Sequence, residues 1–290
     1  MFYATRSQLL EKMMVADFPM WLERLRCPQT KMGGLMVSEI SNADENAMPQ
    51  NGYLVCAAGG TVYDIRDGIL DLAPQTRFSA LTLAGWSNHF FPTPQLYERI
   101  WRTRALGLMT GETFSVAREM QWLRDWAQLQ AGECAVDLGT STGLYARGLS
   151  ETGATIFAVD LAQGMLREAQ KYIRSEKRAN IVLMRAAAEN LPFHDASVDA
   201  VVVGGSLNEM KSMRAAMQES FRVVRAGGRM VTMSLSQAEK PRGKFLQTLA
   251  KQSGIQFPTV NQFNTDAAHA GWKIAKQELK GIVLFSLLTK

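Results

Sequence analysis

Apolar and polar positions alternate with two different periods in the part of the chain that begins near residue 134. Short runs of apolar residues are separated by longer stretches in which apolar residues recur three or four positions apart. The short runs predict buried strands and the longer stretches predict helices. The expected strands cover residues 134–139, 154–160, 180–185, 198–205 and 228–235. This alternation is typical of an α/β fold whose parallel sheet carries helices on both faces.

The last fifty residues follow a different pattern. Residues 244–254 predict a helix, and residues 264–272 predict a short helix capped by Asn264 or Thr265. Two apolar runs at 272–279 and 280–290 then predict strands joined by a tight turn near Lys280 and Gly281. An antiparallel pair is therefore expected to close the otherwise parallel sheet.

The pattern before residue 131 divides into two parts. Residues 19–74 contain two polar, turn-rich stretches and predict a small β-rich module with a loop at 38–51. Residues 76–130 are rich in aromatic residues and predict mostly helix. We therefore expect three parts, at residues 1–75, 76–130 and 131–290.

Composition narrows the class of protein. The 290 residues are 47% hydrophobic and 20% charged, which is typical of a globular chain. The net charge of +5 is mild, and no dense run of Lys and Arg is present, so nucleic acid is not a required partner. No apolar run approaches the roughly 18 residues of a membrane span. The N-terminus lacks a secretory signal, and the three cysteines form no disulfide framework, so a cytoplasmic location is expected.

The stretch "CAVDLGTSTGLYARG" at 134–148 has two interpretations. Its Gly139-Thr140-Ser141-Thr142-Gly143 core matches the G-x-S-x-G turn of serine hydrolases, with Asp199 and His269 as nominal partners. The oxyanion-hole motif that should precede such a turn is absent from the sequence. The hydrolase interpretation therefore rests on the isolated turn alone.

A nucleotide-binding turn is the second interpretation, and more of the chain fits it. Gly139 and Gly143 let the backbone approach a ligand closely after the first strand. Asp160 ends the second strand, 21 residues after Gly139, where an acidic residue can hold a pair of ribose hydroxyls. Ser141 replaces the middle glycine, which is acceptable if its backbone angles are ordinary.

Asp137 favours a cationic ligand over a dinucleotide. Its carboxylate precedes the turn by two residues and would repel a pyrophosphate. The same carboxylate would attract an ammonium or a sulfonium. The alternative is that Asp137 caps the turn that follows the strand.

Residues 134–235 resemble the class I S-adenosylmethionine-dependent methyltransferases, in the branch of the ubiquinone and menaquinone methyltransferases. Four ordered motifs carry the resemblance: "VDLGTSTGLYARGL", "FAVDLAQGMLREAQ", "RAAAENLPFHDASVDAVVVGG" and "AMQESFRVVRAGGR". The resemblance implies a transferase with S-adenosyl-L-methionine as cofactor. It also implies a Rossmann-like sheet of seven strands, the last of them antiparallel.

The resemblance also implies the cofactor-binding residues. Asp137, Gly139 and Gly143 would face the methionine portion, with Ser141 in place of a usual glycine. Asp160 would bind the ribose, Leu161 would flank the adenine, and Ala188 and Glu189 would lie by the adenine edge. Gly204 would offer its carbonyl to the amino group of the ligand. Ala187 stands where the family often has an Asp that accepts a hydrogen bond from adenine.

A second resemblance covers the first part of the chain. The segment "LRCPQTKMGGL" and the later "LVCAAGGTVYDIRDGILDL" resemble the zinc-ribbon-type module of the Trm112 family. Cys27 and Cys56 match one cysteine of each pair, and Thr30 and Gly59 occupy the other two positions. A structural zinc site needs four ligands. We therefore expect a degenerate module without a metal.

Candidate residues for catalysis are few. His89 lies in the aromatic segment expected to form a lid, and Asn208 and Glu209 follow the fourth strand. Tyr97 and Trp101 are candidates for an acceptor pocket. Each has a structural alternative: His89 as a core or surface residue, Glu209 as a helix cap, and the aromatic residues as core.

The aromatic segment favours a small, largely apolar acceptor of aromatic or isoprenoid type. RNA methylation is the first alternative, because of the basic charge and the ribbon-like module. A non-catalytic, regulatory protein of the methyltransferase fold is the second, because of the changes at Ser141 and Ala187.

Overall fold

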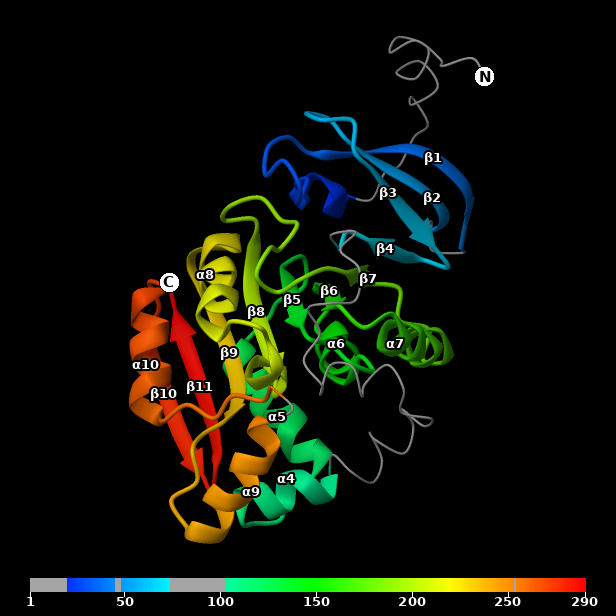
Figure 1. Ribbon diagram of the computed structural model, residues 1–290. Coiled ribbons are helices and arrows are strands. Elements are labelled where there is room, and N and C mark those ends of the chain that lie inside the picture. The colour runs from blue at the N-terminus through cyan, green and yellow to red at the C-terminus, as the bar shows by residue number, and fades with distance from the viewer. Residues whose placement is uncertain (1–19, 45–47, 74–102, 253) are drawn as a thin grey trace.

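The computed structural model describes residues 20–44, 48–73, 103–252 and 254–290 (Figure 1). Within these ranges one mixed sheet has the order β1-β2-β3-β4-β7-β6-β5-β8-β9-β11-β10. Its strands are β1 (Leu35–Ala43), β2 (Pro49–Cys56), β3 (Val62–Arg66), β4 (Ile69–Asp71), β5 (Cys134–Leu138), β6 (Thr155–Asp160), β7 (Ile181–Arg185), β8 (Val198–Gly204), β9 (Val224–Leu235), β10 (Lys273–Lys280) and β11 (Val283–Thr289). The helices are η1 (Met20–Arg24), α4 (Thr103–Thr110), α5 (Val116–Ala127), α6 (Leu144–Ser150), α7 (Gln163–Ser175), η3 (Ser206–Glu209), α8 (Met213–Val223), α9 (Pro241–Lys251) and α10 (Val260–His269).

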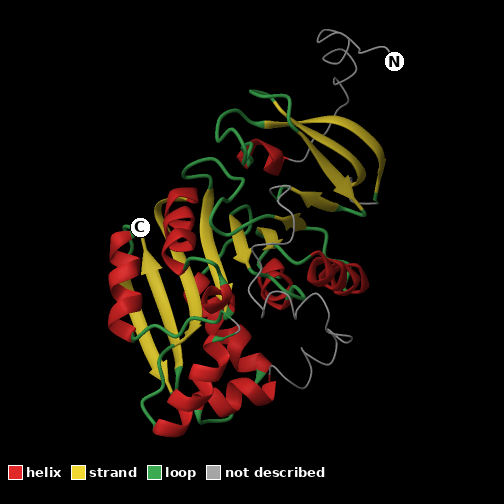
Figure 2. Cartoon of the chain, viewed as in Figure 1, coloured by secondary structure: helices red, strands yellow, loops and turns green. Residues whose placement is uncertain are grey.

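The parallel centre of the sheet is buried on both faces. Strands β7, β6, β5, β8 and β9 run parallel, and every residue of β5 is buried. Val136 and Phe157 pack with α8 and α10 on one face, whereas Ala135 and Ile156 pack with α5, α6 and α7 on the other. Side chains alternate across a strand, so continuous apolar strands need two covering layers. The predicted α/β architecture with helices on both faces is confirmed (Figure 2).

The C-terminal pair of strands closes the sheet as predicted. β11 runs antiparallel to both β9 and β10. The turn between β10 and β11 contains Gly281 with a φ of 58°, and a Cβ there would lie 2.1 Å from the Met109 carbonyl oxygen. Only glycine fits this turn without displacing the end of α4.

The continuous sheet of the described residues has eleven strands, four more than the seven expected for the part after residue 131. β5 to β11 do form seven consecutive positions, but β4 adds to the far edge by parallel pairing of Ile69 with Leu183 and Asp71 with Arg185. β1, β2, β3 and β4 continue outward as an antiparallel meander. An open edge of β7 can accept a further strand, and pattern alone does not identify that strand. The three-part division of the chain stays a prediction.

Three local expectations change. The loop expected at 38–51 is largely a hairpin, because β1 extends to Ala43 and β2 starts at Pro49. α10 begins at Val260, since Thr259 and Gln262 form a reciprocal capping box one turn before the expected caps. The predicted lid lies partly outside the described residues, which resume at α4. His89, Tyr97 and Trp101 fall outside them.

Candidate functional site

The loop between β5 and α6 folds over the carboxyl end of β6. The backbone amides of Gly139 and Thr140 donate to the Val159 carbonyl at 2.8 and 3.0 Å. Gly139, Ser141 and Gly143 all have positive φ values, of 71°, 52° and 80°. Alternate left-handed residues turn the chain tightly and bring it back beside the neighbouring strand.

Ser141 therefore lacks the ordinary backbone angles that its substitution for glycine was expected to require. A non-glycine residue in the left-handed region is uncommon and persists where its surroundings hold it. Here its amide donates to Asp160 Oδ2 at 2.8 Å, and its Oγ contacts Met165 Sδ at 3.6 Å. The two contacts join the loop to the last residue of β6 and to the first turn of α7.

Asp160 lies at the position predicted for the ribose-binding acid. Its Oδ1 accepts from the Ala162 amide at 2.8 Å while Oδ2 accepts from Ser141. The two amides orient the carboxylate at the junction of the two loops, and a carboxylate can accept about four hydrogen bonds in all. Its orientation and charge fit the hydroxyl pair of a ribose.

Asp137 caps the turn, which is the structural alternative weighed for it. Its side chain is 1% exposed, and its Oδ2 accepts from Thr140 Oγ1 at 2.5 Å and from the Ala146 amide at 2.9 Å. The carboxylate thus sits at the positive end of α6. Contact with the methionine portion of a cofactor stays a prediction.

The loops after β5 and β8 pack tightly against each other. Ser206 Oγ donates to the Leu138 carbonyl at 2.9 Å, and a Cβ at Gly139 would lie 2.1 Å from that Oγ. A Cβ at Gly143 would lie 3.2 Å from the Ala169 Cβ. Gly139 is therefore required by packing inside the protein as well as by its φ value, whereas Gly143 is favoured by its φ value and by a tight approach to Ala169. Gly204 ends β8 and stands two residues before Ser206, so it begins the loop that carries this serine.

Arg185 and Asp71, which were not identified from the sequence, hold the segment at Leu161 that is predicted to flank the adenine. Arg185 Nε donates to the Leu161 carbonyl at 3.1 Å, and its Nη1 pairs with Asp71 Oδ1 and Oδ2 at 3.0 and 3.1 Å. Arg185 could have been identified from the sequence, because it ends the apolar run that follows the one ending in Asp160. No local signal identified Asp71, which is 114 residues away.

Two polar candidates are engaged with the protein backbone. Glu189 Oε1 accepts from the Ser212 amide at 3.1 Å, at the start of α8. Asn208 is 1% exposed; its Oδ1 accepts from the Leu235 amide, and its Nδ2 donates to the carbonyls of Leu235 and Gln256. A buried amide with three backbone partners positions loops and does not accept a proton. Glu209 is half-buried at the end of η3, and Ala188 is half-buried against the core.

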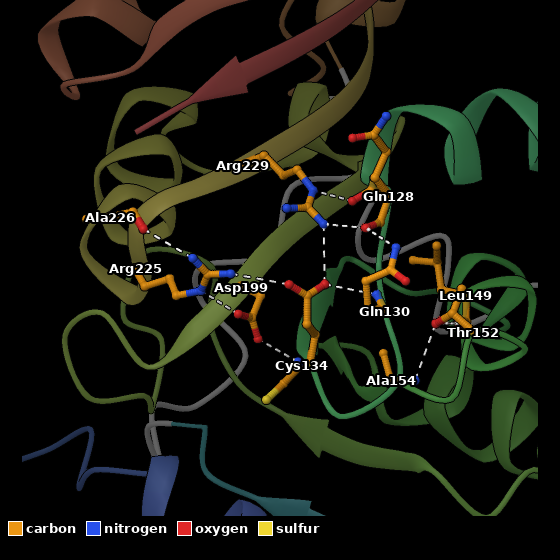
Figure 3. Close-up of polar contacts among 12 residues, drawn as sticks. Gln128, Gln130, Cys134, Leu149, Thr152, Ala154, Asp199, Arg225, Ala226 and Arg229 are labelled. Carbon is orange, nitrogen blue, oxygen red and sulfur yellow. Dashed lines mark hydrogen bonds and ion pairs between the residues drawn. The ribbon is translucent and has the colours of Figure 1, made fainter.

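Asp199 lies at the opposite end of the sheet from Ser141, so it cannot orient a base for that serine. Figure 3 shows Asp199 beside Cys134, whose amide donates to Oδ2 at 2.7 Å, and beside Arg225, whose Nε pairs with Oδ1 at 2.5 Å. Burial raises the pKa of the Cys134 thiol to about 11. His269 is exposed at the end of α10. This geometry excludes the serine hydrolase interpretation.

A hollow of about 620 Å³ adjoins the network in Figure 3 and lies at the same end of the sheet. Its lining residues are Arg124, Asp125, Gln128, Leu129, Gln130, Leu149 and Thr152. It is therefore separate from the glycine loop and its carboxylates.

The four positions compared with zinc ligands gather at one point of the N-terminal strands. The Thr30 amide donates to Cys27 Sγ at 3.5 Å, and Thr30 Oγ1 lies 3.4 Å from Cys56 Sγ. A Cβ at Gly59 would lie 2.9 Å from Thr30 Cγ2 and 3.9 Å from Cys56 Sγ. Thr30 thus contacts both thiols. In the part of the chain that the structure describes, no three His, Cys, Asp or Glu side chains group as metal ligands.

The Cys27 thiol has an altered acidity. Burial raises its pKa, but hydrogen bonds with Cys56, Thr30 and Tyr63 outweigh burial and lower the pKa to about 7. Tyr63 OH lies 3.2 Å from Cys27 Sγ, and burial together with this thiol raises the pKa of the tyrosine. Cys27, Thr30, Cys56 and Tyr63 therefore form one coupled polar cluster in the core of the module.

Residues 136–232 match the family described as "Methyltransferase domain". This match and the strand order define a class I methyltransferase domain with a Rossmann-like sheet. The cofactor of the domain is S-adenosylmethionine. The matched range contains the glycine loop, Asp160, the Arg185 strand and the loop after β8.

Relatives of known name match parts of the chain. A demethylmenaquinone methyltransferase of Clavibacter sepedonicus is 34% identical over 111 residues, which are 38% of this chain and 44% of that protein. An uncharacterized chloroplastic methyltransferase of Arabidopsis thaliana is 29% identical over 207 residues, 67% of this chain and 57% of that protein. The chain spans about half the length of the curated relatives it matches.

A solved structure extends the likeness of fold. The geranyl diphosphate methyltransferase in complex with GPP and sinefungin has a TM-score of 0.52 at 15% identity, over 59% of this chain and 77% of that chain. At this identity the likeness concerns the fold alone. Within the described residues, each helix is too short or too polar to cross a lipid bilayer.

Proposed function

We propose that the protein transfers the methyl group of S-adenosylmethionine to a small, largely apolar acceptor of aromatic or isoprenoid type. The observation that carries the proposal is the junction at the carboxyl edge, where the loop after β5 meets Asp160 on one side and Ser206 on the other. Similarity to a demethylmenaquinone methyltransferase supports the class of acceptor.

The cofactor fits the groups at this junction. Asp160 would accept hydrogen bonds from the two ribose hydroxyls. Asp137, Gly139, Gly143 and Gly204 would surround the methionine portion, where the carboxylate of Asp137 attracts cationic ammonium and sulfonium groups. On the adenine side, Leu161 would flank the ring, and Ala188 and Glu189 would lie by its edge. Ser141 would contribute the loop backbone that Asp160 holds.

The protein has little covalent chemistry to supply. A methyl group on a sulfonium is already activated when the cofactor is bound. The chain must hold the acceptor in line with that methyl group and exclude water. We propose residues 76–130 as the lid that does so, with His89, Tyr97, Trp101 and Glu209 as acceptor contacts. The parts on either side are the module at 1–75 and the cofactor domain at 131–290.

Binding of S-adenosylhomocysteine, measured by titration calorimetry, tests the cofactor site. Asp160→Asn should lower the affinity by about tenfold or more, because a hydrogen bond to a charged carboxylate is worth about 1.5–3 kcal/mol. Asp266→Asn is the matched control, since Asp266 lies on α10, pairs with Arg214 of α8 and has no place at the junction. Equal affinities in the two variants would contradict the role of Asp160.

Methyl transfer tests the acceptor. Radiolabelled S-adenosylmethionine should deliver its methyl group to reduced demethylmenaquinone and related apolar quinols. Transfer to ribosomal or transfer RNA alone would replace this proposal with the RNA alternative. Failure to bind the cofactor at all would favour the non-catalytic, regulatory alternative.

For the N-terminal strands we propose a degenerate module of the Trm112 type that folds without metal. The convergence of Cys27, Thr30, Cys56 and Gly59 supports this proposal, because four ligand positions must face one point in a tetrahedral site. Thr30 and Gly59 have no side chain that binds zinc well. Packing and hydrogen bonds replace the metal in this proposal.

A further inference from the structure

Helix α9 is turned with its polar side inward and its apolar side outward. Gln247 is 6% exposed, whereas Phe245, Leu246 and Leu249 are 65%, 64% and 48% exposed. A surface helix ordinarily places its apolar stripe against the core. The outward side of α9 therefore forms an apolar face, which we define as Phe245, Leu246 and Leu249.

Specific contacts fix this orientation. Gln247 Oε1 accepts from the Ala238 amide at 2.8 Å, and its Nε2 donates to the Ser236 carbonyl at 2.9 Å. A Cβ at Gly243 would lie 2.7 Å from the Ala238 Cβ, so the helix approaches the preceding segment closely at Gly243. Rotating α9 to bury its leucines would break both hydrogen bonds and remove a buried amide from its partners.

The segment that carries α9 is anchored at both ends. Asn208 bonds to Leu235, which ends β9 before the helix, and to Gln256, which follows it. Gln256 returns a bond from its amide to the Asn208 carbonyl at 2.8 Å. α9 thus projects as a short excursion from the carboxyl end of β9. It lies at the end of the molecule opposite strands β1, β2 and β3 (Figure 1).

Basic residues flank the apolar face. Residues 239–251 contain Lys240, Arg242, Lys244 and Lys251 against the single acid Glu239, and all four basic residues are exposed. Their charge complements an anionic surface. The exposed side chains of Leu246 and Leu249 would not contribute to RNA binding. Proteins bind the RNA backbone through positive charge and the bases through aromatic stacking. The combination of aliphatic and basic groups favours lipid.

We propose that α9 docks on the surface of an anionic phospholipid bilayer. Phe245, Leu246 and Leu249 enter the boundary between headgroups and acyl chains, and the basic residues contact the lipid phosphates. An apolar acceptor dissolved in the bilayer would then lie near the carboxyl edge of the sheet. Only this last consequence rests on the proposed methyl transfer, since docking itself needs neither cofactor nor acceptor.

Vesicle sedimentation of the full chain tests docking. The protein should sediment with phosphatidylcholine vesicles that contain phosphatidylglycerol, and about tenfold less with phosphatidylcholine alone. Phe245→Ser/Leu249→Ser should abolish most of the binding, and Lys240→Glu/Lys244→Glu should remove the preference for anionic lipid. Leu279→Ser and Lys273→Glu are matched controls on β10, where both residues are exposed, and should bind as the unaltered protein does.

Three outcomes would overturn the proposal. The first is no sedimentation of the unaltered protein with anionic vesicles. The second is unchanged binding of Phe245→Ser/Leu249→Ser, because binding would then be purely electrostatic and RNA would compete for it. The third is a lowered melting temperature of that double variant, because the apolar face would then be covered by protein. Since no S-adenosylmethionine is added, none of these results depends on methyl transfer.

Discussion

Asp71 at the end of β4 binds the guanidinium of Arg185 through both carboxylate oxygens, and Arg185 also donates to the Leu161 carbonyl. Asp160, Arg185 and Asp71 are register partners across three parallel strands. Their side chains therefore lie in a row along the carboxyl edge. Through this row the N-terminal strands contact the segment predicted to hold the adenosine.

Asp71→Asn should weaken the binding of S-adenosylhomocysteine by about three- to tenfold, a loss of about 1 kcal/mol. Arg185 would keep its charge but lose the carboxylate that holds its guanidinium beside the Leu161 carbonyl. In an Arg185→Gln background the Asp71→Asn change should have no further effect. Titration calorimetry of the unaltered protein, the two single variants and the double variant measures this double-mutant cycle.

Asp64→Asn is the control for the Asp71 experiment, because Asp64 pairs with Arg66 in the same module. A loss of affinity in this variant as well would mean that the module affects cofactor binding only through its general stability. Side chains of Asp71 and Arg185 are about one-third exposed, at 37% and 30%, so little change in unfolding free energy is expected.

Ser141→Gly should stabilise the fold by about 1 kcal/mol, because glycine has no penalty at a φ of 52°. Cofactor affinity should stay the same or rise. Urea unfolding measures the first effect, and calorimetry the second. Lys177→Gly is the matched control, since Lys177 has a φ of 53° outside the glycine loop. A marked loss of affinity in Ser141→Gly alone would assign a binding role to the serine hydroxyl.

Gly139→Ala should destabilise the protein by about 3 kcal/mol, through left-handed strain and collision with Ser206. Gly132→Ala isolates the strain, since Gly132 has a φ of 85° and no atom within 4 Å of its Cβ position. That control should cost only about 1 kcal/mol. Adding Ser206→Gly should recover part of the loss at Gly139. Equal costs at the two glycines would show that the Ser206 contact relaxes freely.

Thr30→Cys/Gly59→Cys should create a four-thiolate zinc site. The two changes belong together, because a Cβ at Gly59 meets the Thr30 methyl group at 2.9 Å and Thr30→Cys removes that methyl. Metal analysis after incubation with zinc should find one ion per chain in the double variant and none in the unaltered protein. Adding Cys27→Ser should abolish the binding. Stoichiometric zinc in the unaltered protein would refute the metal-free proposal.

The Cys27 thiol should make stability depend on pH between about 7 and 9. Its pKa is lowered from 9.0 to about 7, so the folded protein binds fewer protons than the unfolded chain in this window. Stability from this group is therefore full above pH 9 and is lost as pH falls through 7, by at most about 2.7 kcal/mol. Urea unfolding of Cys27→Ser should show a flatter profile.

Cys134→Ser is the control for the pH experiment. The pKa of Cys134 is raised to about 11, so its contribution changes only above pH 9. Its substitution should leave the slope between pH 7 and 9 unaltered. A profile for Cys27→Ser that parallels the unaltered protein would show that the thiol cluster does not titrate in this range.

Local pattern was sufficient for the elements of the methyltransferase domain. Five apolar runs predicted β5, β6, β7, β8 and most of β9, because a buried strand is specified by its own consecutive side chains. The end of the second run likewise predicted that Asp160 lies at the carboxyl end of β6. The turn at Lys280 and Gly281 was likewise visible in the residues that form it.

Contacts between distant segments needed the folded chain. The pairing of β4 with β7, and with it the bond between Asp71 and Arg185, depends on which edge of the sheet stays open after the other strands have paired. The left-handed angle of Ser141 depends on Asp160 and Met165, which belong to other elements.

The inward carboxylate of Asp137 and the outward leucines of α9 also depend on contacts with other segments. A side chain's type is local, but the direction in which it points is set by the partners that packing brings to it. Thr140 and the start of α6 turn Asp137 inward, and the backbone of Ser236 and Ala238 draws Gln247 beneath the helix. Periodicity along one segment carries no information about those partners, so only the tertiary structure decides them.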